Sequence, residues 1–556
     1  MYLKIHLHIV SFIKENKVFT LGMLLLAILL LKNPLSPNNI ISNLEPSPDS
    51  IHYLNPLVSL LQGKGLVLSY QNRSIPAQVP PLYSLVLLPL YLIFREIRFF
   101  YVTNVLLTII SAILFYKIIT KLITDKILKS ILFLAFATNY IIYWYPSVAM
   151  AENLLIPLYL LSIWLLLQPV TFTVALLISF LVMAFFATKY IAWILSLSLT
   201  ALFIVKLFAV KTAPRRKYLF LSLFFLNLLI LFSVFAYAEY LNKGVNIFNV
   251  IRNNLHQLVA VFLSFFTKPQ VEAIHQTAKA TVTYSKFYMA DSFIRYLAGI
   301  MGGPVTVVGV DFIILPIIVG MTSIPAIFTN LFTGKNRLLS FYLFISIVGT
   351  LYFISTFRTV DARYLFALIP AFFLIFGLFL DTLCKLLVNR NRKIYVYLLL
   401  GFVYAAISLD VFPLVIKQLK INFFRPDVAM NYEAIMTMNA YTNKLTEVPK
   451  PVIISVLSPF MIDFYSNRKY EVLPLSRGQY FTDNLEKVWG INPKNSLNGI
   501  YGDYLADGRL VLISLYDTDD DIWVIFDMKK IKEKFNLLLA IQGCNDKCNL
   551  YKLEHK

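Results

Sequence analysis

The sequence has little charge for its length. Only 14% of its 556 residues are Asp, Glu, Lys or Arg, whereas 58% are hydrophobic and 15% are aromatic. The mean hydropathy is +0.70. Soluble globular domains carry about 25% charged residues. This composition excludes a soluble protein and predicts a polytopic α-helical membrane protein.

Acidic residues and cysteines are also few. The chain has 30 acidic and 50 basic residues, a net charge of +20. In a soluble domain this excess would suggest a nucleic-acid partner. Here much of it falls in short loops between apolar runs, where Lys and Arg mark the cytoplasmic side, so we expect no nucleic acid. Three cysteines exclude a disulfide scaffold, and a local bridge between Cys544 and Cys548 stays open.

The basic residues predict the topology. Lys4, Lys14 and Lys17 precede the apolar run 18–31, and Asn33-Pro34 rather than a small-residue cleavage site follows it. The run is therefore expected to be an uncleaved first span with a cytoplasmic N-terminus. About eleven spans follow from the apolar runs. They are 18–31, 99–116, 131–145, 154–167, 174–187, 191–208, 218–240, 304–331, 338–356, 365–380 and 395–411.

One apolar run does not fit this series. Leu82–Phe94 has about 13 residues, too few for the ~20 that cross a bilayer. A crossing here would also put the basic cluster after residue 116 outside. We expect an interfacial or re-entrant helix at the outer surface, near Asp49. The transmembrane domain then covers 1–413, with long outer loops at 33–98 and 241–303.

The composition changes after Ile416. Apolar runs become short and alternate with polar ones, which indicates a soluble α/β domain over 414–556. An odd number of spans places this domain outside the cytoplasm. The expected strands are 451–456, 509–514 and 521–526, and the expected helices are 461–466 and 528–535.

The first outer loop has the residues best suited to chemistry. Asp49 lies among prolines, with His52 and Tyr53 close behind it, and Lys64 and Tyr83 follow. Loops of this length are usually functional. An acidic residue held against a membrane suits chemistry on a lipid-linked substrate.

Five short motifs lie along the chain: Pro48-Asp49-x3-Tyr53, Gln62-Gly63-Lys64-Gly65, Pro80-Pro81-Leu82-Tyr83, the segment from Tyr145-Pro146 to Glu152-Asn153, and Asp361-Ala-Arg363-Tyr364 with Pro370. They resemble motifs of GT-C glycosyltransferases, in particular the branch of protein mannosyltransferases and lipid A aminoarabinose transferase-like enzymes. The resemblance implies a polyprenyl-phosphate sugar donor, an extracytoplasmic acceptor and a location in the cell (inner or plasma) membrane, or in the ER membrane of a eukaryote.

The resemblance also implies roles for two acids. Asp49 would be the general base on the acceptor hydroxyl of an inverting transfer, and Glu152 would support it. A positioned carboxylate can take the proton that the acceptor loses. The alternatives are that Asp49 caps a helix starting at Ser50 and that Glu152 only meets a helix dipole. Many family members have Asp-Glu where this chain has Asp49-Ser50.

With fewer carboxylates, the loop does not favour a divalent metal such as Mg or Mn, and no other cofactor is expected. Cations on the outer face would bind the donor's phosphate, with Lys189 and Arg363 the best placed. Each could instead snorkel to lipid headgroups. The full set of expected substrate contacts is His52, Tyr53, Lys64, Tyr83, Lys189, Arg358, Arg363 and Tyr364, with Arg73 a further cation.

Two other classes of function compete with transfer. A transporter or flippase of lipid-linked sugars would place polar sites near the bilayer midplane, whereas this chain concentrates polar residues in outer loops. Asp311 and Asp381 are the main exceptions. A non-catalytic assembly subunit is the third reading, against which an intact Asp49 and Glu152 argue.

Overall fold

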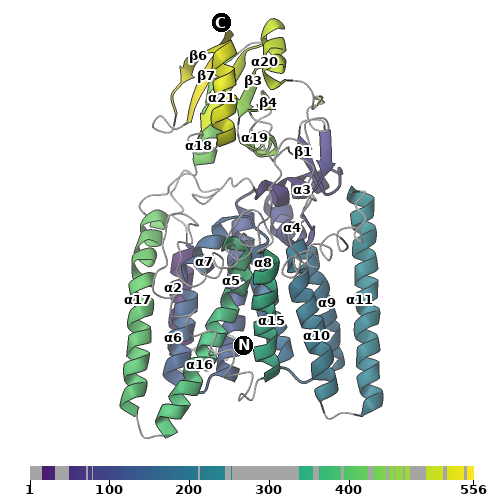
Figure 1. Ribbon diagram of the computed structural model, residues 1–556, viewed down its shortest axis with the longest axis vertical. Helices are drawn as coiled ribbons and strands as arrows, with labels where there is room; N and C mark the ends of the chain where they lie inside the picture. Colours follow the sequence, from purple (N-terminus) through teal and green to yellow (C-terminus); the bar gives the residue numbers. More distant parts are fainter. Residues whose placement is uncertain are drawn as a thin grey trace, which may run out of the picture.

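The chain forms a helical membrane bundle with a small mixed domain above it (Figure 1), as seen in a computed structural model. The structure describes residues 16–31, 49–70, 73–77, 79–210, 213–243, 252, 337–354, 362–389, 393–423, 430–445, 450–455, 457–466, 470–475, 492, 496–516, 522–543 and 548–556. The expected span 304–331 and nearly all of the outer loop 241–303 lie outside these residues.

Helices of the bundle follow the predicted apolar runs. Within the described part of the chain, five are long and apolar enough to cross a membrane, or six if one bent pair counts as a span. The helices are α2 (Lys17–Leu30), α5 (Phe99–Leu122), α6 (Lys126–Ala137), α7 (Tyr140–Trp144), α8 (Glu152–Leu166), α9 (Phe172–Thr188), α10 (Trp193–Ala209), α11 (Pro214–Lys243), α15 (Arg337–Ile354), α16 (Ile369–Asn389) and α17 (Lys393–Phe423).

The expected span 131–145 is broken. Helices α6 and α7 meet at an angle of 44°. Asn139 lies between them, and its side chain accepts a hydrogen bond from the Ile141 N–H (3.1 Å). An amide oxygen that satisfies a free N–H starts a new helix at this position, so the chain bends here instead of continuing straight.

Helix α4 (Leu82–Phe94) does not cross the bundle, as predicted. Its first turn is tied to α5 by Tyr83, whose hydroxyl donates to Asn104 Oδ1 (2.8 Å). Its last residue stacks on the first residue of α5, with the Phe94 and Phe99 rings 3.8 Å apart. Arg95 ends the helix in the left-handed conformation, φ 56°. Both ends of α4 therefore lie beside the start of α5, at one end of the bundle.

The basic loops gather at the other end. Lys121 donates to the Leu167 carbonyl (2.7 Å), and Lys206 donates to the Leu166 carbonyl (2.7 Å). These contacts place the last turns of α5, α8 and α10 together. Tyr116 of α5 donates to Asn16, directly before α2 (3.1 Å). The N-terminal end of α2 thus lies with the basic residues, as the positive-inside pattern predicts.

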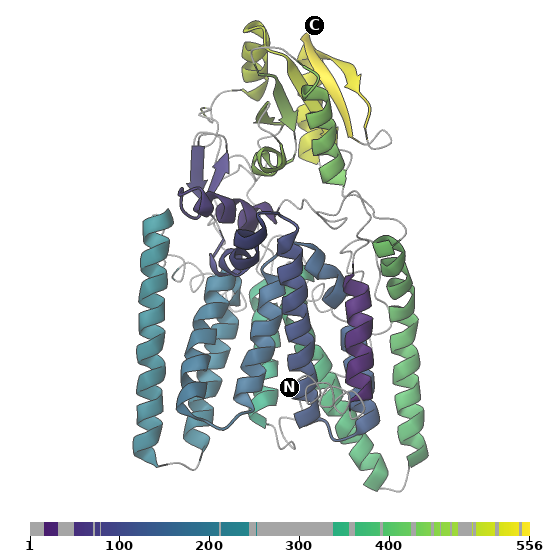
Figure 2. The ribbon, with the colours of Figure 1, turned by 180° about the vertical axis from the view of Figure 1, so that it is seen from behind.

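Above the bundle, a five-stranded sheet has the order β4-β3-β5-β7-β6. The β4-β3-β5 part is parallel, and β7 pairs antiparallel with β5 and β6. Figures 1 and 2 show this sheet and its helices at the end opposite the basic loops. The elements are α18 (Met430–Thr442), β3 (Val452–Ser455), α19 (Pro459–Tyr465), β4 (Glu471–Pro474), α20 (Leu497–Ala506), β5 (Val511–Tyr516), α21 (Ile522–Lys534), β6 (Phe535–Ile541) and β7 (Cys548–His555).

One expected strand was wrong. The apolar run 521–526 is not a strand, because α21 begins at Ile522 and continues to Lys534, within the helix expected at 528–535. A short apolar run does not distinguish a buried strand from a buried helix turn. The strands expected at 451–456 and 509–514 are confirmed as β3 and β5. The boundary expected at 413/414 falls inside α17, and we propose that the soluble domain begins after Phe423.

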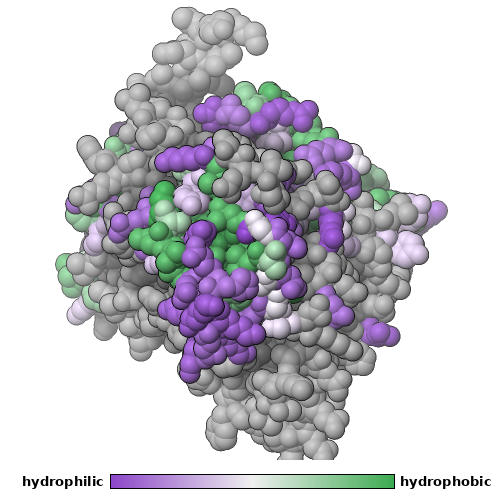
Figure 3. Space-filling model, turned by 90° about the horizontal axis from the view of Figure 1, so that it is seen from above, coloured by the Kyte–Doolittle hydropathy of each residue, from purple (hydrophilic) through white to green (hydrophobic). Residues whose placement is uncertain are grey.

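The two parts have different surfaces. Figure 3 shows the end with the sheet, where hydrophilic residues surround an apolar area. On α11, by contrast, large apolar side chains such as Leu229 and Val234 are 62% and 65% exposed. Such a surface is stable in lipid and not in water, so α11 faces the bilayer.

Candidate active site

The site begins in the first outer loop, on helix α3 (Ile51–Leu61). The N-cap of α3 is Ser50, and Asp49 precedes the cap; the Asp49 carbonyl accepts the His52 N–H (3.2 Å). Ser50 itself has helical dihedral angles, and its side chain makes no cap hydrogen bond. Asp49 and His52 thus lie together at the start of α3, at the end of the bundle beside the sheet domain (Figure 1).

The environment of His52 favours the neutral form of its imidazole. Burial lowers the pKa of its imidazole, because a charged ring loses hydration, and the nearby Asp49 carboxylate opposes part of that shift. Its Nδ1 atom is buried with no hydrogen-bond partner among the described residues. The imidazole of His52 can therefore offer a neutral hydrogen-bonding group beside Asp49.

A hydrogen-bonded path leads from α3 into the bundle. The Tyr53 ring packs edge-on against Tyr83, with centroids 5.2 Å apart, and the Tyr53 carbonyl accepts the Ser84 hydroxyl (2.9 Å). Tyr83 is fully buried and donates to Asn104 of α5. The Asn104 amide in turn donates to the carbonyls of Pro146 (3.0 Å) and Val148 (3.1 Å). Tyr83, with Tyr53 packed against it, thus supports the second outer loop through Asn104.

The second outer loop ends at a buried ion pair. Glu152 is the first residue of α8 and is 1% exposed. It pairs with Lys189, and its Oε2 atom accepts the Tyr145 hydroxyl (3.2 Å). Asn153, the next residue, fixes the loop by donating to the Val148 carbonyl (2.8 Å). A carboxylate at the positive end of a helix is also favoured by the helix dipole.

Lys189 is the more accessible partner of this pair. Its side chain is 19% exposed, against 2% for that of Glu152. The ammonium lies 4.7 Å from the centre of the Tyr364 ring, a cation–π distance. Tyr364 belongs to η3 (Ala362–Leu368), which also includes Arg363. The Asp49 loop, the Glu152 loop and the Arg363-Tyr364 segment thus converge at one end of the bundle, as far as the described side chains show.

Three other expected contacts have different outcomes. Lys64 is exposed and donates to Ser69 Oγ (3.3 Å), so it fixes its own loop. Arg358 lies outside the described residues, and so does the side chain of Arg363.

No group of three or more His, Cys, Asp or Glu side chains that could hold a metal lies within the described residues.

Sequence reasoning missed a second buried acid beside this cluster. Glu239 of α11 is 2% exposed, and its Oε2 atom accepts the hydroxyl of Tyr190 (2.8 Å), the neighbour of Lys189. Asn104 and Tyr145 were missed as well. A signal existed for two of them, because Asn104 and Glu239 are polar residues within long apolar runs, and such residues are functional candidates by default.

Comparison with solved structures decides the fold. Two crystal structures of ArnT from Cupriavidus metallidurans align with 96% of this chain and 97% of their own length at 11% identity. One is the apo state, with a TM-score of 0.57, and the other is bound to undecaprenyl phosphate, with a TM-score of 0.59.

The chain has the ArnT fold. This confirms the polytopic architecture that the GT-C resemblance implied, over nearly the full length of the chain, including the sheet domain. No protein-family model and no curated protein sequence matches the chain. At 11% identity the likeness concerns the fold, so the roles of the individual residues rest on the contacts described above.

Proposed function

We propose that this chain is a membrane glycosyltransferase that moves a sugar from a polyprenyl-phosphate donor to an acceptor outside the cytoplasm. One observation supports this most. A buried carboxylate–ammonium pair, Glu152 with Lys189, lies at the end of the bundle where the Asp49 loop meets the membrane helices. The shared fold adds to this, since one ArnT structure is bound to undecaprenyl phosphate, a polyprenyl phosphate.

In this proposal Asp49 is the general base. The acceptor hydroxyl gives its proton to the Asp49 carboxylate as its oxygen attacks the anomeric carbon of the sugar. The bond between that carbon and the phosphate oxygen breaks, and the electron pair leaves with the lipid phosphate. One direct displacement inverts the anomeric configuration. The phosphate leaves as a stable anion and needs no acid.

Cations would hold that phosphate. Lys189 can turn toward an incoming anion, because its ammonium is partly exposed while Glu152 keeps it at the end of the helices. Arg363 precedes Tyr364, whose ring lies against Lys189, and a guanidinium suits a phosphate by its planar fork. Glu152 sets the position of Lys189 and lends negative charge to the site.

The polar groups fit a transporter less well. Asp381 accepts hydrogen bonds from the Thr124 N–H (2.9 Å), the Thr124 hydroxyl (2.8 Å) and the Asp125 N–H (3.2 Å). It thus closes the turn between α5 and α6 at the basic end, away from the midplane where transporters bind their substrates. Asp311 lies outside the described residues.

Transfer by purified protein is the direct test. The protein is reconstituted in lipid with an envelope extract as acceptor and with each of a panel of radiolabelled polyprenyl-phosphate sugars in turn. We expect that with one of these donors the label leaves the lipid fraction. The Asp49→Asn protein is the matched control. A flippase would leave the label on the lipid and expose it on the other leaflet of closed vesicles. That result, or no transfer with any donor, would contradict the proposal.

The side of the membrane on which the proposed site lies can be tested separately. An impermeant maleimide applied to intact cells should label Asp507→Cys, which is exposed in the C-terminal domain, and spare Lys126→Cys, which is exposed at the start of α6. The background is low, because Cys384 is buried and Cys548 is disulfide-bonded. A disulfide itself fits an oxidising compartment. Labelling of position 126 alone would mean that the protein has the opposite orientation in the membrane.

A further inference from the structure

One face of the C-terminal sheet is only partly covered by helices of the C-terminal domain itself. Its strands alternate between two cores. One core includes Ile454, Ile513 and Leu553 and is closed by α20 and α21. The other includes Ile453, Leu512 and Leu550, and residues of the first outer loop complete it together with α18 and α19. The loop residues in this second core are Ile51, Leu68, Tyr70 and Ile75.

Helix α3 therefore lies between two cores. Ile51, at its start, belongs to the core of the C-terminal domain, whereas Tyr53, Leu54 and Leu57 belong to the core of the membrane bundle. Asn55 fixes α3 to the strand β1 (Val67–Tyr70): its amide donates to the Ser69 carbonyl (2.9 Å), and its oxygen accepts the Ser69 N–H (2.7 Å). A shift of the C-terminal domain would move β1, and with it α3.

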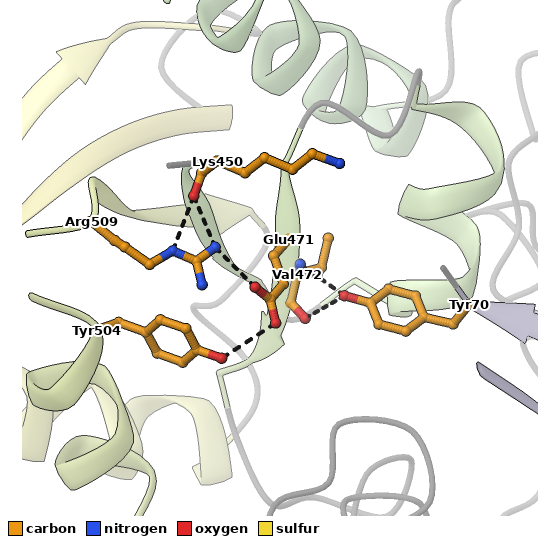
Figure 4. Close-up of polar contacts among 6 residues, drawn as sticks. All are labelled: Tyr70, Lys450, Glu471, Val472, Tyr504 and Arg509. Carbon is orange, nitrogen blue, oxygen red and sulfur yellow. Dashed lines mark hydrogen bonds and ion pairs between the residues drawn. The ribbon is translucent and has the colours of Figure 1, made fainter. Parts of the chain in front are cut away.

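One hydroxyl joins β1 to the sheet. Tyr70 donates to the Val472 carbonyl (2.8 Å) and accepts the Val472 N–H (2.9 Å), as Figure 4 shows. β4 is the edge strand beside β3. The Glu471 N–H bonds the Pro451 carbonyl next to β3 (3.0 Å), so the N–H and C=O of Val472 point to the open edge. The Tyr70 ring itself is 3% exposed.

We propose that the C-terminal domain is a positioning component of the active site and that Tyr70 is the positioning residue through which it holds α3. The proposal rests on the proposed function, in which Asp49 acts from the start of this helix. The domain fixes the angle at which the Asp49 carboxylate meets the acceptor, and it does not contact the donor. Misplacement of a catalytic group by about 1 Å can cost ~10²-fold in rate.

The test is Tyr70→Phe in the full-length protein in lipid nanodiscs, because it removes the hydroxyl and keeps the buried ring. Loss of two hydrogen bonds should speed amide exchange in a peptide covering 51–61 by about 5- to 30-fold, with α8 and α20 unchanged. Turnover should fall about 10-fold, and the KM for a polyprenyl-phosphate sugar should stay constant.

The matched control is Tyr504→Phe. Tyr504 donates to Glu471 Oε1 (3.3 Å), one residue from Val472, and its ring lies 4.7 Å from the Arg509 guanidinium. Arg509 also bonds Glu471 (2.9 Å). This hydroxyl therefore serves the C-terminal domain alone (Figure 4), within the described contacts. The Tyr504→Phe protein should match the wild type in the exchange of 51–61 and in turnover.

Two outcomes would overturn the proposal. Unchanged exchange at 51–61 in Tyr70→Phe means that the hydroxyl does not hold α3. Faster exchange with unchanged turnover means that α3 is held there without consequence for catalysis. If the wild type transfers no sugar at all, the proposed function fails, and the exchange measurement still decides whether Tyr70 holds the helix.

Discussion

Asp49→Asn should lower turnover by about 10²–10⁴-fold and change donor affinity little, since this is the range that general-base catalysis contributes. The amide keeps the size of the carboxylate and cannot take the acceptor's proton. The donor, bound through its phosphate, should be unaffected in the ground state. Steady-state kinetics with a fixed acceptor separates turnover from KM, and the thermal unfolding temperature in detergent reports folding.

The alternative role predicts a different pattern. If Asp49 served only the start of α3, Asp49→Asn would be nearly neutral, because Asn and Asp stabilise helix starts about equally, and Asp49→Ala alone would do harm. Near-normal transfer by a folded Asp49→Asn protein would remove Asp49 from catalysis and shift the role of base to Glu152.

Lys189→Met should destabilise the protein by about 3–5 kcal/mol, because it leaves the Glu152 carboxylate buried without a counter-charge. The double variant Glu152→Gln with Lys189→Met should recover most of this loss, because the buried carboxylate that would lack its counter-charge is removed as well. Thermal and denaturant unfolding in detergent measures both. The matched control is Lys552→Met, which breaks an exposed pair with Glu554 (2.8 Å, side chains 46% and 40% exposed) and should cost at most ~1 kcal/mol.

The transfer kinetics of the double variant then show whether the Glu152–Lys189 pair binds the donor or only stabilises the bundle. The double variant should be stable and still transfer poorly, with a raised KM for the donor, because a phosphate contact acts in the ground state as well as in the transition state. A double variant with wild-type kinetics would make the pair a structural feature of the bundle and would leave the phosphate to other cations.

The span pattern and α4 could be predicted because both depend on local quantities, the length of an apolar run and the charge beside it. Leu82–Phe94 was placed from these alone. The break at Asn139 was not, because one polar residue in an apolar run can cap a new helix or face a neighbour, and the choice depends on packing. The run 521–526 failed for a similar reason, since its periodicity is ambiguous.

The candidate site was predictable in its residues and not in its contacts. The sequence singled out Glu152, Lys189 and Tyr364, and the structure brings these three together. The residues next to Asn104 in the sequence do not indicate that it bonds the second outer loop. Those next to Tyr70 do not indicate its hydrogen bond to Val472, 402 positions later. Such pairs depend on how helices far apart in the chain pack.

The shared core of the first outer loop also sets the order of events during synthesis. At about 5–20 residues per second, some 20–80 s separate the emergence of Tyr70 from that of Val472. During this time Leu68 and Ile75 have no sheet to cover them, although most membrane helices are already made. The loop that carries the proposed base is thus among the first parts of the chain to leave the ribosome and among the last to mature. A chain interrupted before its final ~130 residues would be inserted in the membrane with this loop unfinished.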